Sequence, residues 1–570
     1  MSVTTAPSAT IPAGLPVRDS VVDLLVVGTG TGMAAALAAH ERGMSVLIVE
    51  KSSYVGGSTA RSGGALWLPA SPILADRGGA EDTMQRAENY LHSVVAGTAP
   101  AERSAGYLRN VTPTVNLLLR TTPIRLSWAK DYSDYHPEEP GGTAAGRTCE
   151  CRPLNSAILG EYRTRLRPGV MEANVPMPTT TADYRWMNLV ARVPRKGIPT
   201  IAKRLIQGLS GLLIGRRYVA GGQALSAGLF AGVVRAGIPI WTSTELHRLT
   251  TDDGRVTGAV LAHDGHEVAV TARRGVVLAA GGFDHSMAMR WKFQSESLGE
   301  HLSLGAETNT GDAIHAAQDV GAATDLMDQA WWFPAVSPLP GGAPSVMLAE
   351  RSLPGSLIVD QNGNRFINEA TDYMSFGQCL LERERSGHPV ESMWIVFDQK
   401  YRNSYVFGGA LFPRMPIPSS WYDAGIAHRS NDLNDLAEMI GVPRTHFSAT
   451  MTRFNDMSRA GHDADFHRGD SAYDRYYGDP TIAPNPNLRA LDHGPFYAVK
   501  MALSDLGTCG GLRADERARV LRENGTVISG LYAIGNTAAN AFGTTYPGAG
   551  ATIAQGLVYG YIAAHDAAGD

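Results

Sequence analysis

Short apolar runs and a helix-prone segment alternate near the start of the chain. Residues 21–27 read VVDLLVV and residues 45–49 read SVLIV. Such runs are typical of strands buried on both faces of a parallel sheet. Between them, residues 33–42 are rich in alanine and favour a helix, and Gly43 suits its C-terminal cap. The pattern predicts strand, glycine turn, helix and strand within about thirty residues, the length of a βαβ unit.

The turn of this unit carries the chemistry of a dinucleotide site. Gly28, Gly30 and Gly32 precede the helix, whose free N–H groups attract a pyrophosphate. Glu50 follows the second strand and can accept hydrogen bonds from a ribose. The spacing is one residue shorter than G-x-G-x-x-G. Either Gly32 serves as the third glycine in a tightened turn, or the loop binds phosphate less well. A glycine turn without a ligand is the alternative to both.

Two later regions show the same preference for strands that end in glycines. Residues 249–282 alternate in polarity around the turn pairs Asp253-Gly254 and Asp264-Gly265, and they end in VVLAAGG. Residues 530–536 read GLYAIGN. If these segments meet the first unit, the cofactor domain is discontinuous in sequence.

Composition supports a large buried ligand and excludes several classes of protein. Glycine accounts for 63 of the 570 residues, well above the usual share of ~7%. Charged residues make up 18% of the chain, below the usual ~25%. The length allows two to four domains at roughly 150 residues each. A net charge of −5 gives no electrostatic footprint for nucleic acid. No apolar run is long enough to predict a membrane-spanning helix, and residues 1–20 resemble a loose tail rather than a secretory signal.

Cysteine usage indicates neither a disulfide scaffold nor a metal site. Four cysteines in so long a chain favour a reducing compartment. Cys149 and Cys151 form a C-x-C pair, but no second pair or nearby histidine completes a zinc set. We therefore predict no metal.

Several segments together make the chain recognisable. It resembles the fumarate reductase/succinate dehydrogenase flavoprotein superfamily over roughly residues 21–567, and within it the 3-ketosteroid Δ1-dehydrogenases. The segments that carry the resemblance are STARSGGALWLP, YSDYHPEEPGG, RGVVLAAGGFDH, NTGDAI, DQAWW, RFINEATDY, FHRGDSAYDRYYGDP, SDLGTCGGL, GLYAIGN and TYPGAGATI.

The resemblance implies an α/β fold with two domains. A Rossmann-like FAD-binding domain of the glutathione-reductase type would comprise residues 21–295 and 495–570. An α+β catalytic cap domain, inserted at 296–494, would cover the flavin. Residues 154–217 would be a further insertion that the flavin fold does not need.

The resemblance also implies non-covalently bound FAD and the residues that line its site. In such flavoproteins, small residues after the second strand line the flavin. The expected cofactor-binding residues are Gly28, Gly30, Gly32, Glu50, Lys51, Gly57, Ser58, Thr59, Ser62, Gly63, Gly64, Ala280, Gly281, Asp312, Gly535, Asn536, Ala551, Thr552 and Ile553.

The family's reaction removes the 1α and 2β hydrogens of a 3-ketosteroid, with FAD as the hydride acceptor. An external electron acceptor, which we expect to be a quinone, then reoxidises the flavin. The family's oxyanion site matches Tyr546 and Gly550, which would stabilise charge on the ketone oxygen. Its base, which takes the C2 proton, matches Tyr373. Its relay tyrosine matches Tyr135, although Tyr132 lies only three residues earlier.

Apolar side chains favour a steroid over the dicarboxylate of the fumarate branch. Trp331, Trp332 and Met374 are the expected pocket residues, together with Phe333. SDLGTCGGL lacks the histidine of that branch. Cys509 within it departs from the family's frequent lysine, and Ala549 replaces a frequent proline. The alternatives are desaturation at C4–C5 of 5α-reduced ketosteroids, a flavin-dependent ene reductase, and a non-catalytic steroid-binding protein.

The insertion contains a segment with two possible partners. Residues 195–217 read RKGIPTIAKRLIQGLSGLLIGRR, in which basic pairs bracket an apolar decade. Residues 196–217 could lie in a membrane interface, or they could form a helical hairpin packed on the protein. We expect a bacterial cytoplasmic protein, peripheral to the inner face of the membrane in the first case.

Overall fold

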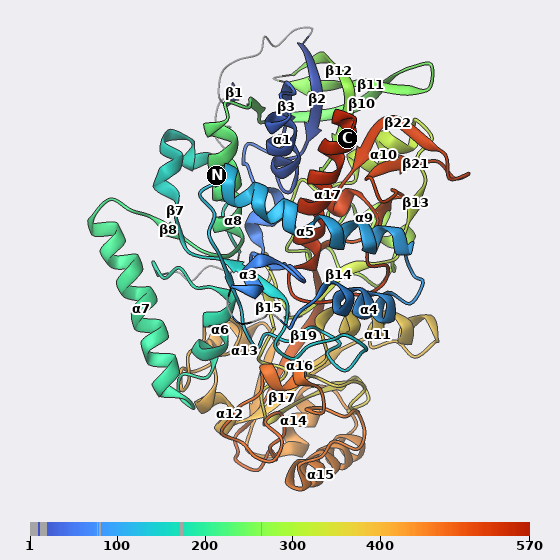
Figure 1. Ribbon diagram of the computed structural model, residues 1–570. Helices are drawn as coiled ribbons and strands as arrows, with labels where there is room; N and C mark the ends of the chain where they lie inside the picture. Colours follow the sequence, from blue (N-terminus) through green and yellow to red (C-terminus); the bar gives the residue numbers. More distant parts are fainter. Residues whose placement is uncertain (1–9, 12–19, 77, 79–80, 171–174, 264) are drawn as a thin grey trace.

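The structure is a computed structural model that describes residues 10–11, 20–76, 78, 81–170, 175–263 and 265–570 (Figure 1). The tail expected over 1–20 falls almost wholly outside these residues, as does Asp264 of the second turn pair.

The predicted βαβ unit is confirmed at the N-terminus. Strand β2 (Ser20–Val27), helix α1 (Gly32–Glu41) and strand β3 (Val46–Val49) follow one another, and β2 pairs with β3 in parallel. Every residue of β3 is buried, as expected for a strand covered on both faces. Helix α1 begins and ends within one residue of the predicted bounds.

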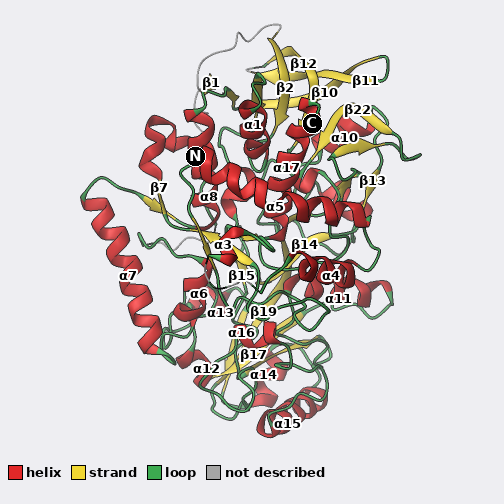
Figure 2. Cartoon of the chain, in the orientation of Figure 1, coloured by secondary structure: helices red, strands yellow, loops and turns green. Residues whose placement is uncertain are grey.

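The three glycine-ending strands meet in one nine-stranded sheet. Strand β12 pairs in parallel with β2 on one side and with β22 on the other. The sheet lies in the upper part of Figures 1 and 2, with α1 and α17 (Ala551–Ala568) packed together against it. Besides β2 and β3, the sheet contains β1 (Thr10–Ile11), β9 (Ile240–Trp241), β10 (Thr244–Asp252), β11 (Arg255–His263), β12 (His266–Leu278), β21 (Arg519–Leu521) and β22 (Val527–Ala533).

A second sheet of six strands forms the lower part of the molecule (Figure 2). Strand β19 pairs with β14, β17 and β18 and so runs through its centre. The strands are β14 (Ala330–Val336), β15 (Ser345–Val346), β16 (Ser356–Asp360), β17 (Met393–Asp398), β18 (Ala427–Ser430) and β19 (Phe496–Thr508). The helices of this region are α11 (Tyr373–Arg385), α12 (Gln399–Ser404), α13 (Ser419–Asp423), α14 (Leu433–Met439), α15 (Arg444–Ala460) and α16 (Ala472–Tyr476).

The position of β19 changes where we divide the chain. Residues 496–508 pair with the cap sheet, although the sequence suggested the FAD domain from 495 onward. Helix α10 (Asp312–Gln318) instead contributes buried side chains to the core beneath the nine-stranded sheet. We propose that the cap extends over about 330–508 and the FAD domain over the rest.

The insertion at 154–217 lies along one side of the body. Its longest element, α7 (Pro194–Leu213), stands at the left edge of Figure 1. The insertion is anchored by the pairing of β7 with β8. Its elements are β7 (Leu154–Asn155), η1 (Ser156–Arg165, interrupted at Gly160), α6 (Thr181–Asn188) and α7, and β8 (Tyr218–Val219) follows it.

The remaining elements connect these parts. Strands β4 (Ala65–Trp67), β5 (Leu126–Trp128) and β6 (Thr148–Cys151) form a small sheet, and β13 (Thr324–Asp325) pairs with β20 (Gly511–Leu512). The other helices are α2 (Gly57–Arg61), α3 (Pro72–Ala75), α4 (Met84–Val95), α5 (Ala101–Thr121), α8 (Gly221–Arg235), α9 (Met287–Phe293) and η2 (Gly535–Thr537).

Candidate active site

A cavity of about 560 Å³ runs between the nine-stranded sheet, the cap and the insertion. We call it the site cavity. Its size is within the range of ligand and cofactor sites. Most of the expected cofactor-binding residues line it. These are Gly28, Gly30, Glu50, Lys51, Gly57, Ser58, Thr59, Ser62, Gly63, Gly64, Ala280, Gly281, Asp312, Gly535, Asn536, Thr552 and Ile553.

The glycine turn has the close packing that a phosphate loop needs. Gly28 has φ +108°, and a Cβ there would lie 2.2 Å from the Ala279 carbonyl oxygen. Gly32 lies outside the cavity wall, because a Cβ on it would meet Val26 at 2.8 Å and Ala279 at 3.0 Å. It therefore fills the role of the third glycine, which brings helix and strand together. This packing favours the tightened-turn alternative.

The acid after β3 is held at the cavity wall. The Glu50 carboxylate accepts hydrogen bonds from the Thr29 N–H (3.1 Å), the Thr29 hydroxyl (2.6 Å) and the Ser52 N–H (2.9 Å). These bonds fix an acceptor beside the glycine turn, as recognition of a ribose requires. Together with the open helix N-terminus, this donor and acceptor set fits the adenosine and pyrophosphate part of an FAD.

Three of the expected catalytic residues form one cluster in the cavity wall. The rings of Tyr135, Tyr373 and Tyr546 contact one another with centroid distances of 5.2–5.3 Å. They come from the loop between β5 and β6, the first turn of α11 and the loop before α17. All three are buried. Gly550, at the N-cap of α17, lines the cavity beside them.

The tyrosines differ in their hydrogen bonds. The Tyr546 oxygen accepts the Gly550 N–H at 3.2 Å. Burial raises the pKa of Tyr546 to about 12, and hydrogen bonds from Tyr373 and Gly550 limit that rise. Burial holds the pKa values of Tyr373 and Tyr135 well above their usual range. The Tyr135 hydroxyl partly offsets the rise at Tyr373, although its geometry falls short of a standard hydrogen bond.

Gly550 could not be replaced without moving the backbone. It has φ +86°, and a Cβ on it would lie 2.1 Å from the Ala65 carbonyl. Its N–H and the Tyr546 hydroxyl therefore sit at a fixed separation. Two donors so arranged can act together on one oxygen.

The loop before Tyr373 is fastened by buried side chains. Asp372 caps α11 by accepting the Ser375 N–H at 2.9 Å. The Arg351 guanidinium donates to the carbonyl oxygens of Glu369 and Thr371. These hydrogen bonds hold the backbone just before Tyr373 in place.

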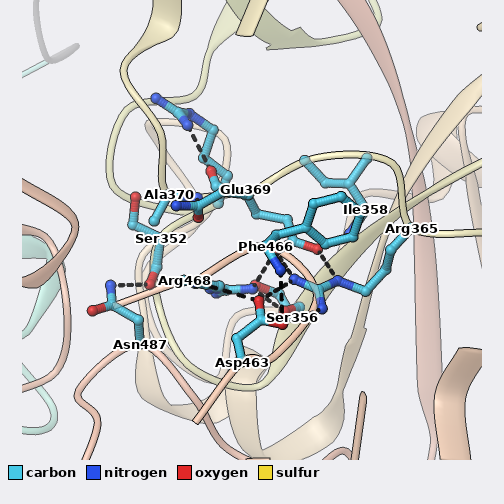
Figure 3. A network of polar contacts seen from close by, with 12 residues as sticks. Ser352, Ser356, Ile358, Arg365, Glu369, Ala370, Asp463, Phe466, Arg468 and Asn487 are labelled. Atoms are coloured by element: carbon cyan, nitrogen blue, oxygen red, sulfur yellow. Dashed lines mark hydrogen bonds and ion pairs between the residues drawn. The ribbon is translucent and has the colours of Figure 1, made fainter. Parts of the chain in front are cut away.

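A buried ion network lies behind this loop (Figure 3). The Glu369 carboxylate binds Arg365 at 2.7 Å and Arg468 at 3.1 Å, and Arg365 also binds Asp463 at 2.8 Å. The four side chains are at most 4% exposed. Burial opposes ionisation of Glu369, but Arg365 and Arg468 still hold its pKa below the usual range. The network ties the Tyr373 loop to the segment around Arg468.

A second buried pair positions Tyr135. Asp134 forms an ion pair with Arg147 and accepts the Trp67 indole N–H at 2.9 Å. Burial raises the pKa of Asp134 to about 6 despite Arg147. The Tyr135 N–H donates to the Pro547 carbonyl at 3.1 Å. Tyr135 and the Tyr546 loop are therefore linked through the backbone.

The apolar residues of β14 are only partly where the sequence suggested. Successive side chains of a strand point to opposite faces. Phe333 lines the cavity and stacks on Tyr373 at 4.3 Å, and Trp331 packs on Tyr546 at 4.8 Å behind the wall. Trp332 points away, against Gly377 of α11.

Five expected site residues do not line the cavity. They are Trp331, Trp332, Met374, Gly32 and Ala551. Met374 follows Tyr373 on α11, but successive residues of a helix point in different directions. Tyr373 therefore faces the cavity, whereas Met374 is buried in the core. Ala551 is the first residue of α17, and its side chain is fully buried.

Several wall residues were missed by sequence reasoning. The insertion supplies Met177 and Tyr184, and Asn309 lies beside the glycines after β12. The Tyr184 hydroxyl also lies 3.3 Å from a Glu350 carboxylate oxygen of the cap. No sequence signal connects the insertion to the cavity, because its contribution depends on how the chain folds back.

Comparison with known proteins decides the family. A family model described as "FAD binding domain" matches residues 23–553. The 3-oxosteroid 1-dehydrogenase of Mycolicibacterium smegmatis is 43% identical over 96% of this chain and 97% of its own. The chain belongs to the 3-oxosteroid 1-dehydrogenase family of FAD-binding proteins.

Two further similar proteins match most of the chain. The crystal structure of 3-ketosteroid Δ1-dehydrogenase from Sterolibacterium denitrificans, in complex with 1,4-androstadiene-3,17-dione, superposes with a TM-score of 0.90 at 34% identity and covers 96% of this chain and 100% of its own. A 4-oxocyclohexanecarboxylate 2-dehydrogenase of Sinomonas cyclohexanicum is 35% identical over 96% of this chain and 93% of its own. The expected fold class and the FAD cofactor are confirmed.

Proposed function

We propose that this protein is an FAD-dependent 3-ketosteroid Δ1-dehydrogenase of steroid catabolism. It converts a 4-ene-3-one into a 1,4-diene-3-one. The observation that carries the proposal is the convergence of Tyr373, Tyr546 and Gly550 in the wall of the site cavity, whose other end fits FAD. When bound, FAD supplies the acceptor for the hydride that leaves C1.

The chain's own residues account for the proton and the ketone. The Gly550 N–H and the Tyr546 hydroxyl donate to the ketone oxygen, where negative charge grows as C2 loses its proton. In the free protein the Gly550 N–H rests on the Tyr546 oxygen. The ketone oxygen takes over that N–H, so the site exchanges one hydrogen bond for two.

Tyr373 takes the C2 proton, and the electron pair of that C–H bond forms the C1=C2 bond as the hydride leaves. This role needs the phenolate form. Because burial holds the pKa of Tyr373 well above its usual range, turnover should rise with pH through the neutral range. Tyr135 assists by donating to Tyr373 as it ionises.

The experiment is to supply a 4-ene-3-ketosteroid with an electron acceptor and to identify the product. A 1,4-diene product supports the proposal, and the absence of turnover contradicts it. Desaturation of a 5α-reduced ketosteroid to the 4-ene alone would instead identify a C4–C5 dehydrogenase. Under anaerobic conditions the steroid alone should bleach the flavin, whereas an ene reductase would need an added donor.

We also propose that α7 rests on the cytoplasmic face of a bacterial membrane. Its glycines face the protein, since a Cβ on Gly208 would lie 1.5 Å from the Pro176 carbonyl oxygen. None of the described helices is long and apolar enough to cross a membrane. Large apolar side chains are exposed instead on and after α7, namely Ile198, Ile206, Leu209, Leu212, Leu213 and Ile214.

This surface suits an interface because basic residues flank it. Arg195 and Lys196 precede the apolar stretch, and Arg216 and Arg217 follow it, where they can meet anionic headgroups. Quinones dissolve in the same membrane, so we propose a quinone as the electron acceptor. If a membrane quinone reoxidised the reduced enzyme no faster than buffer without quinone, the proposal of a quinone acceptor would be excluded.

Vesicles of anionic lipid test the contact. The double variant Leu209→Glu/Leu213→Glu should lose most co-sedimentation at low salt while it keeps turnover of dissolved steroid. Ile158→Glu, at an apolar residue that is 47% exposed elsewhere on the insertion, should sediment like the wild type. Equal sedimentation of all three proteins would exclude α7 as the contact.

A further inference from the structure

Two carboxyl groups that the proposed reaction does not use meet beside the site cavity. Asp284 follows the glycines after β12, and Asp505 lies on β19 of the cap. Both are at most 2% exposed. The Ser303 hydroxyl oxygen lies 2.6 Å from Asp505 Oδ1 and 3.1 Å from Asp284 Oδ2.

Counting protons at this junction fixes its charge state. The Ser303 hydroxyl has one hydrogen, and the shorter contact assigns it to Asp505. The Ser303 oxygen also accepts the Gly305 N–H at 3.1 Å. The contact with Asp284 is then a hydrogen bond only if Asp284 is protonated and donates to Ser303. Two buried carboxylates around one hydroxyl would otherwise repel each other.

The surrounding charges agree with this assignment. Arg290 of α9 pairs with Asp505 and lies 3.4 Å from the Asp284 carbonyl oxygen, so Asp505 is the ionised member. The His285 ring nitrogen lies 3.8 Å from Asp284 Oδ2 and faces it from the neighbouring position. Burial, followed by the charge of Asp505, raises the pKa of Asp284 to about 6.

The junction reaches the cavity through one amide. The Asn309 side-chain N–H group donates to Asp284 Oδ1 at 3.1 Å and to the Ser58 hydroxyl at 2.9 Å. Ser58 also accepts the Ala306 N–H at 2.9 Å. With two donors already on its oxygen, Ser58 keeps its own hydrogen for an acceptor in the cavity. Ser58 and Asn309 both line the cavity.

We propose that Asp284 is a positioning residue that is protonated at low pH and, as it ionises, places a negative charge two hydrogen bonds from Ser58 in the wall of the FAD site. In either form Asp284 accepts from Asn309, which in turn donates to Ser58 and so sets the direction in which Ser58 donates. The ionised form makes reduction of the flavin less favourable, because reduction adds electrons beside a buried anion. The inference rests on FAD in the cavity and is independent of the steroid reaction.

The test is the midpoint potential of the bound FAD as a function of pH, measured in the holoenzyme without steroid. Wild type and Asp284→Asn should have similar potentials at pH 5. At pH 8 the wild-type potential should be the lower of the two, with the divergence centred near pH 6. Asp319→Asn removes the charge of an exposed aspartate and should follow the wild type at every pH.

A difference between wild type and Asp284→Asn that stays constant from pH 5 to pH 8 would overturn the proposal. If Asp284→Asn does not retain FAD, Asp505→Asn serves instead. Loss of the neighbouring charge lowers the pKa of Asp284, so the step in potential should move to lower pH. A wild-type step that stays in place in Asp505→Asn would equally overturn it.

Discussion

The two ends of the site cavity are built in different ways. The cofactor end is made of backbone and small residues from segments that are each continuous in sequence, such as the turn from Gly28 to Gly32. The tyrosine end is made of large side chains from three distant segments, held by buried ion pairs. A backbone site tolerates no added atom, whereas a side-chain site depends on charges that balance one another.

The largest effect is expected where an added methyl group breaks the cofactor end. Gly28→Ala places a Cβ 2.2 Å from the Ala279 carbonyl at φ +108°. Strain of about 1–3 kcal/mol from φ alone adds to that overlap, and we expect purified protein without flavin. The ratio of flavin to protein absorbance measures this.

Gly43→Ala is the matched control. Gly43 also has a positive φ, +76°, but nothing lies within 4 Å of its Cβ position. It should cost about 1–2 kcal/mol, the usual penalty for a side chain in the left-handed region, and keep the flavin. If Gly28→Ala retained full flavin, the close packing at that end would not matter.

The next effect breaks the charge balance behind the tyrosine end. Glu369→Gln leaves Arg365 and Arg468 without their shared carboxylate, and loss of a buried partner costs about 3–5 kcal/mol. Urea denaturation should show that loss. In hydrogen exchange, protection should fall in the loop before Tyr373.

An exposed ion pair gives the contrast. Glu438 pairs with Arg444 where both side chains are more than half exposed, so Glu438→Gln should change stability by less than about 1 kcal/mol. Similar losses in Glu369→Gln and Glu438→Gln would mean that the buried network does not hold the loop.

A smaller, pH-dependent effect tests how the insertion meets the cap. Burial raises the pKa of Glu350 to about 7, so the folded state binds more protons than the unfolded state between about pH 4.5 and pH 7. Its contribution to stability is therefore lost as pH rises through that window, by roughly 3–4 kcal/mol, because one pKa unit corresponds to about 1.4 kcal/mol. Glu350→Gln should flatten this slope in thermal melts.

Parallel losses of stability in wild type and Glu350→Gln between pH 5 and pH 8 would contradict this prediction. The group that titrates would then lie elsewhere, and the Tyr184 contact would carry no linkage between insertion and cap.

The smallest effect concerns the boundary between the two ends. Trp331 packs on Tyr546 and donates its indole N–H to Asn536 at 3.0 Å. Trp331→Phe keeps the ring contact and loses the hydrogen bond, which is worth about 1 kcal/mol. We expect less than about a tenfold change in kcat/KM. Trp332→Phe, on the opposite face of β14, should change kcat/KM still less.

The same contrast explains what the sequence could predict. The βαβ unit, Glu50 and the glycines after β12 follow local patterns whose meaning is fixed by backbone geometry, and they were found. Trp332 was misplaced because one position along a strand reverses the side chain. Met177 and Tyr184 were missed because only the fold brings the insertion to the cavity.

The domain boundary that we propose differs from the predicted one for a related reason. Strand β19 follows the cap in sequence and precedes the last FAD segment, so either sheet could have taken it. Its pairing with β14 and β17 is a long-range choice that no local pattern records. The candidate catalytic tyrosines were predicted from the family resemblance, since each one alone looks like a packing residue.

The central claim is that Tyr373 takes the C2 proton. The most direct measurement is formation of 1,4-diene by Tyr373→Phe, with flavin content determined in the same samples. Tyr473→Phe is the control, because Tyr473 packs on Tyr135 at 4.7 Å outside the cavity wall. The account predicts a loss of about 10²–10⁴-fold in turnover for Tyr373→Phe with FAD retained, and a much smaller loss for the control. Near wild-type turnover by Tyr373→Phe would contradict it.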